Sequence, residues 1–367
     1  MIPYDGTMLP PDGPRQIVGQ QFTERELQTL ILSDVHFIQC TFTDITLTDI
    51  ELCNIHFEHC HFTRLRLNRG RAENSTFRYC QFDDISIEDV AVINALFIEL
   101  RWQGGYFSNC LIERWVLTLC QLDDVQLDNI QLHYWTVQDT PINSLTISNS
   151  KMQDANIHGC VIQQSVWKEC ELIRQVMSSC ILKACEYQLT GCDILVWSQC
   201  QLEQVDFRNQ PLANSNFHKT QLTQCWFNKA NLTAALFDEA QISACDLSQA
   251  QLAAARFADA RLTDCNLQAA QLPKACLLRA NLTRCNLTQT NLAQADMRSC
   301  ALNASSLQAS QLSKTRLHGA QIPLLDATLQ MPDPLLSQID NWYSLHKPGP
   351  KDTAQFPSVP SGASRYV

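Results

Sequence analysis

A residue large enough to fill a core occupies every fifth position of this sequence from Phe22 to Ile322. Only Ala72 and Cys192 are small at that position. A helix repeats its buried face every 3.6 residues and a strand every 2, so neither template explains a period of five. Such self-similarity is typical of repeat architectures. We therefore predict one elongated solenoid over most of the chain, in place of two or three globular domains.

A second regularity lies two residues before each large residue, where the side chain is small or thin, often Cys, Ser or Ala. The other three residues of each unit are mostly polar, so a unit has two inward and three outward positions. The stretch from 22 to 322 resembles the pentapeptide-repeat family in units such as Ala230-Asn231-Leu232, Cys245-Asp246-Leu247 and Ala280-Asn281-Leu282. The resemblance implies an all-β fold, a right-handed quadrilateral β-helix with four units in each coil.

The positions of Phe and Cys give an independent check on the four-sided coil, because residues 20 apart would then stack. Both residue types recur at that spacing, as in Phe22, Phe42, Phe62 and Phe82, and in Cys225, Cys245, Cys265 and Cys285. A coil with three or five sides would not align both sets. We therefore expect a solenoid that advances one coil in 20 residues.

The flanking segments lack the period. Residues 1–19 are rich in Pro and Gly and are expected to form a loop that caps the first coil. The β-helix is expected over 20–322, with an irregular zone at about 91–200. Residues 323–345 contain a predicted short helix that either caps the last coil or pairs two rods as a homodimer, and residues 346–367 have the composition of a flexible tail.

The charge and composition of the chain limit the kinds of partner that it is expected to bind. The net charge is −10, and residues 1–160 carry 21 acidic and 10 basic side chains whereas residues 161–330 carry 13 and 14. This acidity argues against nucleic acid or anionic lipid and favours a basic protein surface. No apolar run long enough for a membrane span and no secretory leader is visible, so we expect a cytoplasmic protein, or one exported without a cleaved signal peptide. The 18 Cys residues are interpreted as small core residues.

No pattern in the sequence predicts catalysis. There is no Gly-rich phosphate loop, nucleophile elbow or HExxH motif. His36, His56, His59 and His61 lie close together on outward positions, but no Cys or carboxylate completes a metal site, so they are interpreted as solvated. We expect no catalytic residue, no cofactor and no bound metal, and therefore no enzyme.

Two groups of residues are candidates for contacting a partner. The first is acidic and outward: Asp83, Asp84, Glu88, Asp89, Asp123 and Asp124. Their alternative role is solubility and protection of strand edges. The second is aromatic and irregular: Trp115 and Trp135 in small positions, and Trp342, Phe356 and Tyr366 near the C-terminus. For the irregular zone, the alternative is a core repacked with large residues.

These features favour a non-enzymatic scaffold for protein–protein interaction. The resemblance places such proteins in bacteria, some of them as secretion-system effectors or accessory proteins. The alternative it implies is an acidic DNA mimic that binds DNA gyrase or topoisomerase IV, as quinolone-resistance proteins do. The acidic N-terminal half fits that alternative, whereas the near-neutral residues 161–330 do not. A metal or ligand binder is the third and least supported reading.

Overall fold

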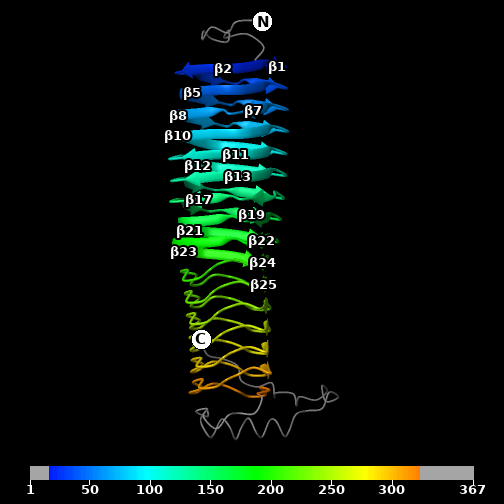
Figure 1. The fold of residues 1–367 in the computed structure, drawn as a ribbon, viewed down its shortest axis with the longest axis vertical. Coiled ribbons are helices and arrows are strands. Elements are labelled where there is room, and N and C mark those ends of the chain that lie inside the picture. The colour runs from blue at the N-terminus through cyan, green and yellow to red at the C-terminus, as the bar shows by residue number, and fades with distance from the viewer. Residues whose placement is uncertain (1–15, 323–367) are drawn as a thin grey trace, which may run out of the picture.

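The protein is a straight rod of stacked coils (Figure 1). This computed structural model describes residues 16–322. The predicted helix at 323–345, the predicted tail at 346–367, most of the predicted N-terminal cap, and Trp342, Phe356 and Tyr366 lie outside the described residues.

All regular structure in the described part is β-strand. The first strands are β1 (Gln16–Val18), β2 (Gln21–Gln28), β3 (Ile31–Ser33), β4 (His36–Ile38), β5 (Thr41–Cys53), β6 (His56–Glu58), β7 (His61–Thr63), β8 (Arg66–Glu73), β9 (Thr76–Arg78), β10 (Gln81–Ile98), β11 (Arg101–Ser108), β12 (Leu111–Thr118), β13 (Gln121–Asp128), β14 (Gln131–His133) and β15 (Thr136–Gln138). The others are β16 (Ile142–Asn143), β17 (Thr146–Ser148), β18 (Lys151–Gln153), β19 (Asn156–His158), β20 (Val161–Gln163), β21 (Val166–Ser178), β22 (Ile181–Lys183), β23 (Glu186–Ser198), β24 (Gln201–Glu203), β25 (Gln221–Thr223), β26 (Gln241–Ser243), β27 (Arg261–Thr263), β28 (Asn281–Thr283) and β29 (Ala301–Asn303).

Strands of neighbouring coils pair in parallel with partners 20 residues apart. Phe42 pairs with Phe62 and Phe62 with Phe82 near the start of the rod. Leu262 pairs with Leu282 near its end. The predicted coil of four five-residue units is therefore confirmed, and the fold is an all-β parallel solenoid.

The two inward positions of each unit fill the rod with one continuous hydrophobic cluster. Residues with numbers ending in 0, 2, 5 or 7 point inward, so large and small side chains alternate along every side. The stacking predicted for Phe is confirmed: the ring centroids of Phe217 and Phe237 lie 4.8 Å apart, with planes inclined by 1°. Stacked rings one coil apart match the spacing of neighbouring strands, because each coil rises by about 4.8 Å.

The corners of the coil have a backbone conformation that the sequence did not predict. From Gly19 to Gly319, every residue whose number ends in 4 or 9 has a positive φ except Leu189. Among the non-Gly residues these angles lie between 47° and 62°. Asn and Asp tolerate this left-handed conformation better than most residues, and both are frequent at the corners. Four left-handed corners per coil make the cross-section four-sided.

The turns differ between two parts of the rod. From Phe207 onward, three sides of each coil end in a hydrogen-bonded turn in which the small residue's N–H donates to the carbonyl three residues earlier, as from Ala230 to Phe227 at 2.9 Å. The fourth side carries β25 to β29 and ends without such a bond. Its small residues are Cys225, Cys245, Cys265, Cys285 and Ser305, with no Ala among them.

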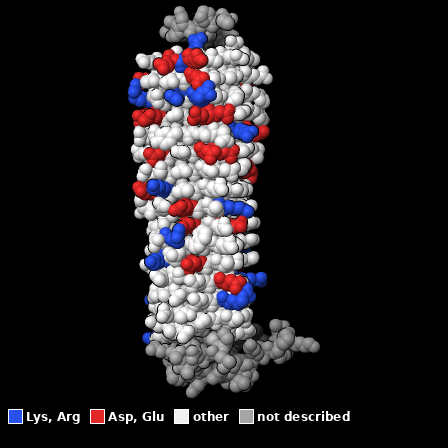
Figure 2. Space-filling view, viewed as in Figure 1, with Lys and Arg blue, Asp and Glu red and all other residues white. Residues whose placement is uncertain are grey.

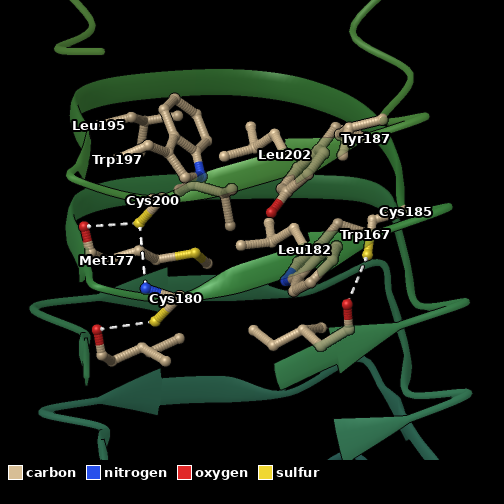
Figure 3. Packing of buried hydrophobic residues seen from close by; sticks show 14 of the residues in the cluster. Trp167, Met177, Cys180, Leu182, Cys185, Tyr187, Leu195, Trp197, Cys200 and Leu202 are labelled. Atoms are coloured by element: carbon tan, nitrogen blue, oxygen red, sulfur yellow. Dashed lines mark hydrogen bonds between the residues drawn. The ribbon is translucent and has the colours of Figure 1, made fainter. Parts of the chain in front are cut away.

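At two positions of the fourth side, the side chain of the Cys or Ser one coil later replaces the missing turn hydrogen bond. The N–H of Cys225 donates to Sγ of Cys245 at 3.3 Å, and the N–H of Cys285 donates to Oγ of Ser305 at 2.9 Å. Figure 3 shows the same arrangement in the N-terminal part, where the N–H of Cys180 donates to Sγ of Cys200 at 3.4 Å. Fifteen of the 18 cysteines are buried, as expected. Their hydrogen bonding, which satisfies buried N–H groups, was not anticipated.

Candidate interaction surface

The candidate surface lies on the outside of the rod, because side chains fill the interior. Outward residues of successive coils form columns, since each lies beside the residue 20 positions later. Asp83 pairs with Gln103 and Gln103 with Asp123, and in the next side Glu88 pairs with Ser108 and Ser108 with Asp128. Asp84 and Asp124 share one corner column, and Asp89 lies at the adjacent corner. The structure thus brings all six predicted acidic residues together on two adjoining sides of the rod.

We call this surface the acidic face and define it as Asp83, Asp84, Glu88, Asp89, Asp123, Asp124 and Asp128. The acids form two rows, from β10 and β13, and in the same columns the coil between them has the uncharged residues Gln103, Gly104, Ser108 and Asn109. Figure 2 shows rows of carboxylates across the N-terminal half of one side of the rod, with fewer charges toward its C-terminal end. Two coils separate the rows, which corresponds to about 10 Å.

Basic side chains adjoin the acidic face at its N-terminal edge and at Arg101, which is exposed and pairs with Gln81 and Gln121 beside the columns. Arg64 donates to both carboxylate oxygens of Asp44, at 2.6 and 2.7 Å, and Arg69 donates to Asp49 in the same way. Both guanidinium groups are therefore engaged with carboxylates of the preceding coil. From residue 83 to residue 128, no Lys or Arg interrupts the columns of the acidic face.

Hydrogen bonds fix several carboxylates of the acidic face. Asp83 lies 2.5 Å from Nε2 of His61, and Asp123 accepts from Asn143 at 2.7 Å and from Gln121 at 2.7 Å. Hydrogen bonds from Ser148 and Asn149 hold the pKa of Asp128 below its ordinary value. Because general acid catalysis needs a raised carboxyl pKa, Asp128 is suited to carry charge and not to deliver a proton.

Asp128 was missed by the sequence analysis because it has no acidic neighbour in the chain. The signal that finds it is its position, 40 residues after Glu88 and five after Asp123. Adjacent acidic pairs mark a run along the chain, whereas a face of this fold is marked by the spacing of 20.

Trp115 and Trp135 are not surface residues. Their side chains are 2% and 1% exposed, and the Trp115 ring packs against Phe97, Trp102 and Phe107. Both residues occupy the inward small position, so the hypothesis that they contact a partner is wrong. A core repacked with large side chains, the alternative, is what the structure contains at these two positions.

The coil-to-coil register changes at one place in the predicted irregular zone. Lys168 pairs with Gln188, but Cys170 pairs with Leu189 and Glu171 with Gly191, so Thr190 is left without a partner and is exposed. We call residues 189–192 with Gln210 the joint. It lies at the change between the two kinds of turn, because the first hydrogen-bonded turn runs from the N–H of Gln210 to the carbonyl of Phe207.

At the joint, the side-chain amide of Gln210 is inserted between two main-chain groups of neighbouring coils. Other corner N–H groups donate to the carbonyl 19 residues later, as from Ala184 to Glu203 at 2.9 Å. For the N–H of Leu189, that acceptor would be the main-chain carbonyl of Arg208. Instead, the N–H of Leu189 donates to Oε1 of Gln210 at 2.6 Å, and Nε2 of Gln210 donates to the carbonyl of Arg208 at 2.7 Å.

A shallow hollow of about 380 Å³ lies beside the joint and is lined by polar residues including Glu186, Asp206, Arg208 and Lys229. Arg208 is held by Asp206 of its own coil, with Nη2 and Oδ2 2.5 Å apart. None of the predicted site residues lines it.

The described residues contain no group that resembles a metal site. The His36 and His56 rings meet edge to face with centroids 6.0 Å apart, and Nε2 of His36 lies 3.3 Å from Glu58. Between residues 16 and 322, no three His, Cys, Asp or Glu side chains are placed as metal ligands would be. In the same range, no helix has the length and apolar character needed to cross a bilayer.

Two family models match the C-terminal half of the repeat. The model described as a pentapeptide repeat region matches residues 235–312, and the model of pentapeptide repeats in eight copies matches residues 215–250. No curated protein sequence matches the chain at a significant level.

Solved structures of similar kind include HetL of the cyanobacterium Nostoc sp. strain PCC 7120, a pentapeptide repeat protein involved in the regulation of heterocyst differentiation. HetL is 20% identical over 51% of this chain and 89% of its own, with a TM-score of 0.31. QnrB1, a plasmid-mediated fluoroquinolone resistance protein, is 13% identical over 59% of this chain and 97% of its own, with a TM-score of 0.27. Similarity at this level carries no information about what the present chain binds.

Proposed function

Because the chain is a pentapeptide-repeat protein, we propose that it acts as a non-enzymatic binding rod whose acidic face docks on a basic surface of another protein. The observation that carries this proposal is the convergence of seven carboxylates on two adjoining sides, with no Lys or Arg between residues 83 and 128 in those columns. Parallel strands hold the backbone beneath these carboxylates at a fixed spacing, so little conformational entropy of the backbone is lost on binding.

The position of the carboxylates supports binding over catalysis. They stand on a convex exterior, and the hollow beside the joint is lined by other residues. Asp128 is held in its charged form by its hydrogen bonds. Two rows of fixed negative charge would attract Lys and Arg side chains and speed encounter at low ionic strength.

A mimic of DNA that binds gyrase or topoisomerase IV is the second candidate, and the acidic face is the observation in its favour. Such a mimic would need negative surface charge along the whole length of the rod. In the C-terminal part, however, acids are neutralised within the chain: Arg279 donates to both oxygens of Asp259, and Arg284 to both of Asp264. We therefore favour a partner that covers only the coils of the acidic face.

The test compares two full-length variants with equal changes in charge. The first carries Asp83→Asn, Asp84→Asn, Asp123→Asn and Asp124→Asn. The control carries Glu169→Gln, Glu186→Gln, Glu203→Gln and Glu239→Gln, which lie outside the acidic face. Binding of an arginine-rich peptide is measured by calorimetry at low and physiological salt. We expect affinity to fall at least tenfold in the first variant and to change little in the control.

Equal binding by both variants would refute the acidic face as the docking site. Purified protein is also added to a gyrase supercoiling assay that contains a quinolone. Relief of inhibition at stoichiometric amounts, lost in the first variant, would favour the DNA mimic over the protein scaffold.

A further inference from the structure

The side of the rod opposite the acidic face carries exposed apolar side chains. Tyr79, Leu111, Leu119 and Tyr134 are 46%, 38%, 54% and 51% exposed, and Leu96 and Val116 lie half-buried between them. We call these six residues the apolar face. Leu96 pairs with Val116 across β10 and β12, so the patch is continuous from one coil to the next. Contiguous apolar patches on a soluble protein mark interaction sites.

The coil geometry places the two faces back to back. Residues ten apart are half a coil apart and therefore lie on opposite sides or at diagonally opposite corners. Tyr134 lies ten residues after Asp124, and Leu96 lies ten after Ser86, which stands between the two corners of the acidic face. A molecule bound to one face leaves the other free.

We propose that the apolar face is the contact surface of a homodimer in which two rods lie side by side and parallel. This proposal does not depend on the function proposed for the acidic face. A second copy is favoured because the two corner columns that flank the side with Leu96 and Val116 complement each other; Leu111 lies beyond one of these corners, on the neighbouring side. One column holds Asn94, Arg114 and Tyr134. Arg114 donates to Oδ1 of Asn94, and one N–H of the Asn94 amide donates to Asn74, so its second N–H and the Tyr134 hydroxyl are the donors for another copy. The other column holds the acceptors Glu99 and Asp139 beside Tyr79 and Leu119.

A two-fold axis parallel to the rod brings the first column of one copy against the second column of the other. Residues at the same height then meet, so Asn94 faces Glu99 and Tyr134 faces Asp139 of the second copy. An axis perpendicular to the rod would place each column against itself and bring carboxylates together. The parallel arrangement is self-complementary, as the contact in a two-fold dimer must be.

Charge also favours a second copy over a charged partner. The acidic faces of the two copies point away from each other, so the strongest like charges are the most distant. At the rim, Arg114 is already paired with Glu113, with Nη1 and Oε1 3.3 Å apart, and Arg71 is paired with Glu73. Docking two apolar faces therefore buries no unpaired Lys or Arg from these two positions, which would be costly. Arg78, which is exposed beside Tyr79 on the same side, has to stay in solvent at the rim of the contact.

The test measures the mass of the full-length protein by sedimentation equilibrium over a range of concentrations. We expect twice the mass of one chain for the unmodified protein. Leu119→Lys, which would face Arg114 of the second copy, and Tyr134→Asp, which would face its Asp139, are each expected to weaken the dimer at least tenfold. Lys is compatible with a corner, since Lys219 and Lys229 occupy corners with positive φ, and circular dichroism checks that each variant is folded.

Trp226→Lys is the matched control, because Trp226 is an outward residue that is 40% exposed but lies on the side of the rod opposite Leu96 and Val116. It is expected to leave the dimer intact. A single-chain mass for the unmodified protein at every concentration would overturn the proposal. So would a dimer that persists in both Leu119→Lys and Tyr134→Asp, or one that Trp226→Lys disrupts equally.

Discussion

At the scale of single residues, the choice between Ala and Cys in the small inward position follows the local hydrogen bonding. Where a tight turn satisfies the N–H of the small residue, Ala is sufficient, as at Ala230. Where the turn is open, the N–H of Cys225 depends on the thiol of Cys245 in the next coil. The column ends with Ser305, which serves Cys285 in the same way. Small size alone therefore does not define this position.

This account predicts unequal effects of removing two buried thiols. Cys245→Ala leaves the N–H of Cys225 without its acceptor, and we expect a loss of about 1–3 kcal/mol in the free energy of unfolding. Cys300→Ala should cost less, because the N–H of Ala280, one coil earlier, already donates to the carbonyl of Leu277 at 3.0 Å and does not need the thiol. Cys245→Ser should restore most of the loss. Urea unfolding of the three variants measures the difference, and equal losses for both Ala variants would contradict the hydrogen-bonding role.

A second residue-scale prediction tests the inward and outward assignment. Leu247 is fully buried and Gln249 is an exposed corner residue two positions later. Leu247→Asp places a carboxylate in an apolar core without a counter-charge, and we expect a loss of about 4 kcal/mol or more. Gln249→Asp should be tolerated, since Asp is common at corners. Similar thermal melts for the two variants would be incompatible with the assignment.

At the scale of elements, the rod consists of two parts with different turns that meet at the joint. The N-terminal part has open turns and longer strands such as β10 and β21, and the C-terminal part has tight turns on three sides. Gln210 closes the gap between them by accepting from Leu189 and donating to Arg208. One inserted amide thus replaces a main-chain hydrogen bond where the register shifts.

Removal of the Gln210 amide should loosen the joint locally. We expect Gln210→Ala to cost about 1–3 kcal/mol and to speed hydrogen exchange at residues 186–192. Gln175→Ala is the control, because Gln175 is also buried in a small position but its Nε2 donates only to Sδ of Met152, at 3.7 Å. Hydrogen exchange followed by mass spectrometry compares the two. Unchanged exchange at 186–192 in Gln210→Ala would show that the amide does not hold the joint.

At the scale of the whole molecule, the period of five residues predicted the solenoid and its inward residues, and the recurrence of Phe and Cys at a spacing of 20 supported the four sides that the family resemblance implied. Phe stacking followed directly, because a residue and its neighbour 20 positions later share one environment. The burial of Trp115 and Trp135 was not predicted, since an oversized residue in a small position can either distort a coil or be packed within it, and only the neighbouring rings decide. The joint was also beyond the sequence analysis, because Leu189 and Gln210 interact across coils.

The candidate surface was predicted in part. Three acidic pairs were visible in the sequence, and the spacing of 20 explains why they converge. The apolar face was missed, because Tyr79, Leu96, Leu119 and Tyr134 occupy outward positions of four different units. That they share one side of the rod becomes evident only when each outward residue is assigned to one of the four sides of the coil.

Ion pairs between coils give the rod a predicted dependence on pH. Hydrogen bonds from Arg64, Arg279 and Arg284 lower the pKa of Asp44, Asp259 and Asp264 respectively. A lowered pKa in the folded state means that the stabilisation is complete above the unfolded value of about 3.9 and is lost as the pH falls through the folded value. The melting temperature should therefore be steady in neutral and mildly acidic buffers and fall in stronger acid.

The size of this acid effect should depend on the arginines. The double variant Arg279→Gln and Arg284→Gln lacks the groups that lower the pKa of Asp259 and Asp264, so its melting temperature should fall less on acidification than that of the unmodified protein. Each pair is exposed and contributes little alone. Melting curves recorded by circular dichroism from neutral to strongly acidic pH provide the comparison, and a steeper fall in the double variant would contradict the assignment.

The claim on which both faces depend is that residues 20 apart lie side by side, and disulfide formation between introduced cysteines tests it directly. Ala234, Ala244 and Ala254 are all corner residues with positive φ. Neighbouring coils are separated by about 4.8 Å, within the Cα separations of about 4.4–6.8 Å that a disulfide spans. Under mild oxidation, Ala234→Cys with Ala254→Cys should form a disulfide identified by peptide mass mapping, whereas Ala234→Cys with Ala244→Cys, at opposite corners, should not. A disulfide in the second pair but not in the first would contradict the four-sided coil.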